Sequence, residues 1–179
     1  MGASRFVKAM AAVVLFNGAL FLCAQANVLA GEREDEAKRY AQQLRTAKDS
    51  KTKVKALTEL GALAQIKKGL IADALPDVYK ATEDKEPAVR AAAAEALGKA
   101  AEPYSKAGGI LVKMLKDEKD DAVKIGALRG LAVMREEAKD ALPAIREIQK
   151  ATAGDKKSKL GDAAKAAATA IGGGKGKKQ

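Results

Sequence analysis

A ten-residue segment that occurs four times constrains the fold more than any other feature of this sequence. The template is VRAAAAEALG at 89–98, and successive occurrences begin 37, 34 and 40 residues apart, as TKVKALTELG at 52–61, VKIGALRGLA at 123–132 and AAKAAATAIG at 163–172. Apolar residues recur in each at the spacing of one helical face. The sequence therefore predicts a series of equivalent helices, here termed the A helices. Gly61 and Gly98 are expected to permit turns at the ends of two of them.

A second recurring segment separates the A helices. It reads ALPDVYKA at 74–81, GGILVKML at 108–115 and ALPAIREI at 141–148. Each unit of about 35 residues is thus expected to hold two short helices, A and B. Pro76 and Pro143 suit the first turn of a B helix, where a missing amide costs nothing. Gly108 and Gly109 are expected to form a loop-to-helix joint before Ile110.

Stacking of these units predicts the fold class. One helical pair cannot bury its apolar stripe alone, whereas stacked pairs bury a continuous core. We therefore expect an all-α fold, an α-solenoid of antiparallel helix pairs over residues 34–171, with about three repeats plus capping helices. Residues 34–47 and 162–171 would cover its two ends. The Gly- and Lys-rich residues 172–179 are expected to be a disordered tail.

The composition excludes several kinds of chemistry. Aromatic residues make up 3% of the chain, and there is no Trp and no His. The three Phe and the only Cys, Cys23, lie within the first 23 residues. Beyond them the chain has no thiol or imidazole, which excludes disulfides, thiolate nucleophiles, His bases and His/Cys metal sites there. We expect no catalytic residue, no cofactor and no metal.

Residues 1–26 are expected to be a signal peptide. Arg5 and Lys8 precede an apolar stretch over residues 9–24, and Ala24 and Ala26 supply small residues two apart, as signal peptidase requires. The stretch covers 16 residues, fewer than the roughly 20 that span a bilayer. We therefore predict an exported protein, periplasmic or secreted, with no transmembrane segment after cleavage.

Alternatives for the same segment stay open. Cleavage is placed after Ala26, with Ala30 as the second choice. The segment could instead anchor the chain in a membrane, although it is short for that purpose. Lipidation of Cys23 is a further alternative, but the bulky Leu22 stands where a small residue would be expected.

Most of the net charge of +10 lies outside residues 31–150. Residues 31–150 hold 24 basic and 21 acidic residues, whereas residues 151–179 hold 7 Lys and 2 Asp. Because the body is nearly balanced, the charge does not indicate a specific nucleic-acid partner. The basic tail is interpreted as a solubilising end, with weak contact to an anionic surface as the alternative.

The units resemble HEAT repeats, in particular the short variety named after the phycobilisome lyases. The resemblance is carried by ALP at 74–76, by DKEPAVR at 84–90 and by ALG at 96–98, and it extends over about 52–172. It implies a B helix, an acidic turn, a Pro and an Ala-rich A helix. HEAT arrays are mostly binding surfaces, so the resemblance also implies an unidentified protein partner.

The resemblance implies a ladder of charges as well. In the family, an acidic residue in the turn and a basic residue six positions later pair along the stack. Asp84 with Arg90 fits this pattern, and Glu118 with Lys124 fits it conservatively. The first and last units depart from this pattern, as expected of capping units. In the first, the residue six positions before Lys53 is Ala47, which is not acidic. In the last, Ser158 and Ala164 occupy the two positions, and neither is charged.

The B helices usually line the concave face of such arrays. The register then places two rows of side chains toward a groove: Tyr79, Lys113 and Arg146, and one turn later Thr82, Lys116 and Gln149. These rows predict a polar and basic groove that takes an acidic peptide or an extended acidic segment of a partner protein. The alternative is an ordinary solvated helix face.

Three function classes follow from these observations. The first is an exported, non-enzymatic interaction module or scaffold. The second is a basic binder of polyanions or membrane surfaces, which would show steep salt dependence. The third is a lyase-type enzyme, since two HEAT-like families are bilin lyases and DNA glycosylases, but the chain lacks a recognisable carboxylate pair and aromatic platforms. The acidic turn 117–121 is interpreted as solvated rather than as a calcium loop.

Overall fold

The structure, a computed structural model, describes residues 31–67, 69–100, 102–155 and 157–173. The expected signal peptide and residues 174–179 of the expected tail lie outside these ranges. The chain divides into two compact units, Met1–Glu36 and Ala37–Gln179. Residues 31–36 of the first unit are helical, and all other described elements belong to the second.

The second unit is built from helices. Residues 37–46 are helical, and the elements that follow are α2 (Ser50–Ile66), η1 (Ala72–Ala74), α3 (Leu75–Ala81), α4 (Pro87–Lys99), α5 (Tyr104–Asp117), α6 (Asp121–Met134), η2 (Arg135–Ala141), α7 (Leu142–Ala151) and α8 (Lys159–Gly172). The described residues contain no strand. The all-α expectation is confirmed, and Gly172, which we assigned to the tail, is the last residue of α8. None of the described helices is both long and apolar enough to cross a membrane.

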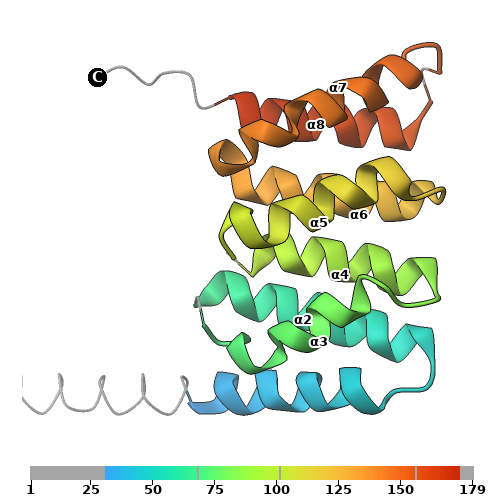
Figure 1. Cartoon of the computed structure of the whole chain (residues 1–179). Helices are drawn as coiled ribbons and strands as arrows, with labels where there is room; N and C mark the ends of the chain where they lie inside the picture. Colours follow the sequence, from blue (N-terminus) through green and yellow to red (C-terminus); the bar gives the residue numbers. More distant parts are fainter. Residues whose placement is uncertain (1–30, 68, 101, 156, 174–179) are drawn as a thin grey trace, which may run out of the picture. The chain divides into compact units, whose positions relative to one another are not determined.

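The helices of the second unit pack as adjacent pairs. The A helices α2, α4, α6 and α8 follow one another along the stack, and each contacts the next (Figure 1). The B helices α3, α5 and α7 pack mainly on the A helix that comes after them in the chain. This arrangement is the α-solenoid that the repeat predicted.

Local sequence explains where the helices begin. Pro76, Pro87 and Pro143 lie in the first turns of α3, α4 and α7. Side chains cap other helices: Asp120 Oδ1 accepts a hydrogen bond from the Ala122 amide at 2.8 Å at the start of α6. Pro cannot supply an amide inside a helix, so its place in the first turn fixes the start of each element.

The expectation for Gly108 and Gly109 is wrong. Helix α5 begins at Tyr104, so both glycines lie within it. Gly108 is buried beneath the Tyr104 ring, and a Cβ at Gly108 would overlap that ring. Gly109 is exposed, and a Cβ there would meet nothing within 4 Å. Gly108 therefore makes room for the Tyr104 ring one turn earlier in the same helix, and neither glycine ends a loop.

The buried side chains form two clusters that meet at α4. The first cluster runs from Ala37 to Ala100 and contains Leu57, Leu60 and Leu97. The second runs from Ala94 to Ile171. Helix α4 contributes Ala93 to the first cluster and Ala94 to the second, so the small side chains of this helix lie between the two cores.

Glycines set the distance between α4 and α6. A Cβ at Gly98 would overlap the backbone of Gly130, and a Cβ at Gly126 would overlap the backbone of Ala91. A Cβ at Gly130 would lie 2.5 Å from the Ala94 carbonyl oxygen. Gly61, expected at a helix end, lies inside α2, where a Cβ would be 3.3 Å from the Ala96 Cα. The glycines therefore allow the A helices to approach with their backbones nearly in contact.

This close approach predicts that Gly126→Ala destabilises the fold. The new methyl group overlaps the backbone of α4, and overpacking of this kind costs about 1–3 kcal/mol in the free energy of unfolding. Gly109→Ala is the matched control, because it makes the same change on an open helix surface and should stabilise by up to about 1 kcal/mol. Urea denaturation followed by circular dichroism measures both. Equal stability of Gly126→Ala and the unchanged chain would contradict the packing argument.

Candidate binding site

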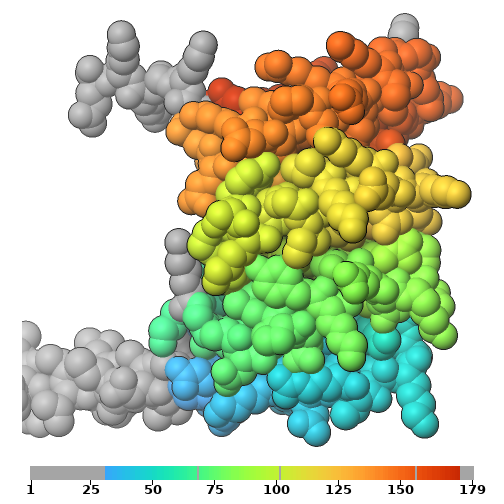
Figure 2. Space-filling model, viewed as in Figure 1, coloured from blue at the N-terminus to red at the C-terminus, as the bar shows by residue number. Residues whose placement is uncertain are grey.

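A groove lies between the B helices α3 and α5. Its cavity volume is about 630 Å³, and its lining residues are Tyr79, Lys80, Thr82, Glu83, Arg90, Ile110, Lys113, Met114, Asp117 and Glu118. On the face shown in Figure 2, the green surface of α3 meets the yellow surface of α5. The groove is therefore formed by two consecutive units of the repeat.

The structure brings three of the six expected groove residues together. Tyr79, Thr82 and Lys113 line the groove. Lys116 and Arg146 are exposed on α5 and α7, outside its lining. Gln149 is half-buried on α7, and its Nε2 donates to the Ala164 carbonyl at 3.4 Å. The members of the two predicted rows that line this groove come from α3 and α5, and the members on α7 do not line it.

Two of the lining side chains are held by neighbouring groups. The Tyr79 hydroxyl donates to Glu102 Oε2 at 3.2 Å, and burial together with the Glu102 carboxylate raises the pKa of Tyr79 above its ordinary value. Thr82 is 7% exposed, and its Oγ1 donates to the Tyr79 carbonyl at 2.7 Å. The Thr82 hydroxyl therefore completes the last turn of α3 instead of facing a partner. The Tyr79 ring is half-buried and positioned at one edge of the groove.

The charge of the groove differs from the expected basic character. Its lining holds three basic residues (Lys80, Arg90 and Lys113) and three acidic residues (Glu83, Asp117 and Glu118). The expected rows were built from helix positions three residues apart, so they did not include the acidic residues at neighbouring positions. Glu83 and Asp117 stand directly after Thr82 and Lys116, and this adjacency was the signal that the sequence offered.

The groove also has an apolar part that the sequence analysis missed. Ile110 is half-buried on α5, and Met114 is 6% exposed one turn later. Both residues line the groove beside Lys113. A Met is an adaptable apolar surface because its side chain is unbranched and polarizable. The groove therefore offers an apolar floor with charges of both signs around it.

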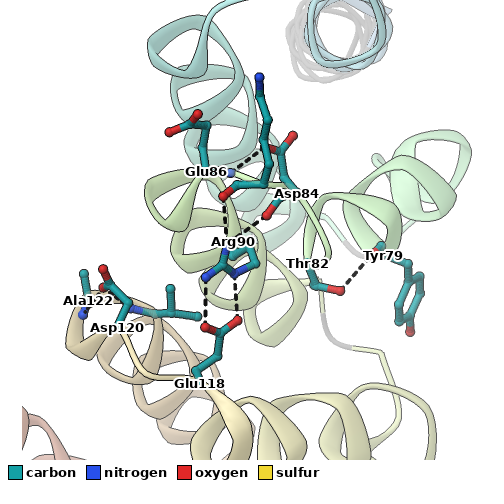
Figure 3. A network of polar contacts seen from close by, with 10 residues as sticks. Tyr79, Thr82, Asp84, Glu86, Arg90, Glu118, Asp120 and Ala122 are labelled. Atoms are coloured by element: carbon teal, nitrogen blue, oxygen red, sulfur yellow. Dashed lines mark hydrogen bonds and ion pairs between the residues drawn. The ribbon is translucent and has the colours of Figure 1, made fainter.

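A bidentate ion pair forms one wall of the groove. Arg90 Nε donates to Glu118 Oε1 at 2.7 Å, and Arg90 Nη2 donates to Glu118 Oε2 at 2.9 Å (Figure 3). Arg90 Nη1 donates to the carbonyl oxygens of Asp84 and Lys85 at 2.9 and 3.1 Å. One guanidinium thus joins the turn before α4 to the turn before α6. Planar bidentate pairs of this kind add geometric specificity.

The observed ladder pairs the acid of each turn with a basic residue in the A helix of the preceding unit. Lys53 Nζ lies 2.6 Å from Asp84 Oδ2, as Arg90 lies beside Glu118. Arg90 contacts the backbone of Asp84 rather than its carboxylate, and among the described residues Lys124 takes part in no ion pair. The sequence analysis did not include Lys53 in the ladder because Ala47 occupies the position six residues earlier, where an acid was expected. Its partner instead lies 31 residues later, close to one repeat length.

The ladder shifts the ionisation of its members. The Glu86 amide donates to Asp84 Oδ1 at 3.0 Å, and this bond together with Lys53 lowers the pKa of Asp84 below the ordinary value of 3.8. The Glu118 carboxylate raises the pKa of Arg90. Both groups are therefore charged in the folded state at neutral pH.

Asp84→Asn is expected to lower the free energy of unfolding by about 1 kcal/mol at neutral pH, since the Lys53 ion pair is partly open to solvent. The folded pKa of Asp84 is depressed, so its contribution is present above pH 3.8 and is lost as the pH falls through the folded pKa. The difference between variant and unchanged chain should therefore shrink below pH 3.8. Asp117→Asn, at an exposed position, is the control and should change stability by less than about 0.5 kcal/mol. A pH-independent loss for Asp84→Asn would contradict this assignment.

Comparison with known proteins assigns the family. The family described as HEAT repeats matches residues 37–132, more than half of the 179 residues. No curated protein matches the chain. The match runs through α6, and the structure continues the same pairing with α7 on α8. The chain belongs to the HEAT repeat family.

Proposed function

We propose that this protein is an exported, non-enzymatic interaction module that binds a segment of a partner protein in the groove between α3 and α5. HEAT repeats suggest a protein–protein interaction scaffold. Export is supported by the basic start, apolar stretch and small residues of 1–26. The absence of His from the chain, and of Cys after residue 23, supports binding rather than catalysis.

The observation that carries this proposal is the apolar floor of the groove. Ile110 and Met114 provide apolar surface that is flanked by charged side chains, and the cavity of about 630 Å³ falls within the size range of ligand pockets. A partner side chain that covers this floor gains apolar burial, while its neighbours meet the charges at the rim. Specific protein interfaces have the same organisation of apolar centre and polar rim.

The charges favour a segment of mixed sign. Arg90 and Glu118 neutralise each other, which leaves Lys80 and Lys113 to meet acidic groups and Glu83 and Asp117 to meet basic groups. A uniformly acidic segment would be repelled by the Glu83 and Asp117 carboxylates. The best fit is an apolar residue with an acidic residue on one side and a basic residue on the other.

A comparison of Lys113→Glu with Arg146→Glu tests the groove. Both residues are exposed on B helices and belong to the same predicted row, but only Lys113 lines the groove. Peptides selected from a displayed library against the unchanged chain should lose about tenfold in affinity for Lys113→Glu, since one charged contact is reversed. Arg146→Glu should leave the affinity unchanged. Fluorescence anisotropy at physiological salt provides the dissociation constants.

Other outcomes of this comparison point to the competing function. Equal losses in the two variants, together with steep salt dependence, would indicate binding of polyanions by general positive charge. Failure to select any peptide would remove the groove as a binding site. Circular dichroism of each variant establishes that the helices are retained.

A further inference from the structure

A second groove lies on a different face, formed only by A helices. It runs over α4 between α2 and α6 and has a cavity volume of about 440 Å³. Its lining consists of small and apolar residues of the three helices together with Thr58, Glu95, Lys99 and Arg129. It shares no residue with the groove between α3 and α5.

The floor of this groove is made of alanines. Ala88, Ala91, Ala92 and Ala96 recur at helical spacing on α4 and line the groove. Because alanine side chains are short, the groove is open above α4. The half-buried Val54 on α2 and Ile125 on α6 line its two sides. At Gly126, α6 lies directly against the Ala91 backbone. A helix laid along such a floor can approach α4 to about 8 Å between axes, the short end of the usual packing range.

One end of the groove is polar and carries net positive charge. Glu95 Oε1 lies 2.6 Å from Lys99 Nζ, and Glu95 Oε2 lies 3.4 Å from Arg129 Nη1. These are the three charged residues in the lining, so two cations share one carboxylate. Burial opposes ionisation of Glu95, but Lys99 and Arg129 hold its pKa below the ordinary value. The site therefore keeps a net charge of one positive unit at neutral pH.

Arg129 is the cation that remains available. Its side chain is 65% exposed, whereas that of Lys99 is 21% exposed. Among the described residues its only hydrogen bond is the long one from Nη1 to Glu95. Its other N–H groups can thus receive a carboxylate from outside in the fork geometry that guanidinium groups favour.

We propose that the groove over α4 docks an amphipathic helix of a partner protein, with its apolar face on the alanine floor and a carboxylate on Arg129. The alanine floor accounts for a helix as occupant, and the single excess positive charge accounts for an acidic residue at one end of its apolar stripe. The proposal goes beyond the function proposed above, because it concerns a second site made by other helices.

A displayed library on a helix-forming frame, with varied positions along one face, tests this proposal. Selection against the unchanged chain should enrich apolar residues at helical spacing, with Asp or Glu at one end. The affinity of the best peptide should fall about tenfold for Arg129→Gln. Replacing the acidic residue of the peptide by Gln or Asn should lower its affinity for the unchanged chain by the same factor. The same peptide change should cause no further loss of affinity for Arg129→Gln. Arg146→Gln, the matched exposed control, should bind as the unchanged chain does.

A second variant tests the floor. Ala92→Leu keeps helix propensity and fills the groove, so it should abolish binding of the selected peptide while circular dichroism remains unchanged. Lys113→Glu should bind the peptide normally, which separates this site from the one between α3 and α5. Enrichment without a carboxylate, or binding that survives both Arg129→Gln and Ala92→Leu, would overturn the proposal. Concentration-dependent self-association abolished by Ala92→Leu would also overturn it, by showing that a second copy occupies the groove.

Discussion

The contact between the backbones of α4 and α6 is the constraint on which the rest of this structure depends. The two apolar clusters meet at α4, and neither contains a large aromatic anchor. They are joined where Gly98, Gly126 and Gly130 let the two helices approach without intervening side chains. Because small residues bury little area each, this interface gains stability through many close contacts along its length. The abundance of Ala and Gly in the A helices is thus a packing requirement.

The two ion pairs of the ladder link neighbouring units of the stack beside the groove between α3 and α5. Lys53 in α2 pairs with Asp84 in the turn before α4, and Arg90 in α4 pairs with Glu118 in the turn before α6. These turns precede α4 and α6 and directly follow α3 and α5, so the ladder fixes the spacing of the B helices as well. Arg90 and Glu118 also line the groove between α3 and α5, so the pair that joins the two turns forms one of its walls.

Much of the fold followed from the sequence, because helical periodicity and the recurrence of segments are local signals. The four A segments lie within α2, α4, α6 and α8. Details that depend on neighbouring units did not follow. Gly108 accommodates the Tyr104 ring, and Lys53 pairs with an acid one repeat later. Half of the expected groove residues line the groove, but the acids and the apolar floor emerged only when α3 and α5 were seen side by side. Register along one helix does not reveal which side chains the next unit brings close.

The most direct test of the groove between α3 and α5 is a nuclear magnetic resonance titration of the chain with a peptide selected from the displayed library. Chemical-shift changes should cluster on the two B helices, at Tyr79, Ile110 and Lys113, and should leave Arg146 on α7 unaffected. Changes confined to the Lys-rich C-terminal residues, or spread evenly over exposed lysines, would contradict a defined groove and indicate association by charge alone.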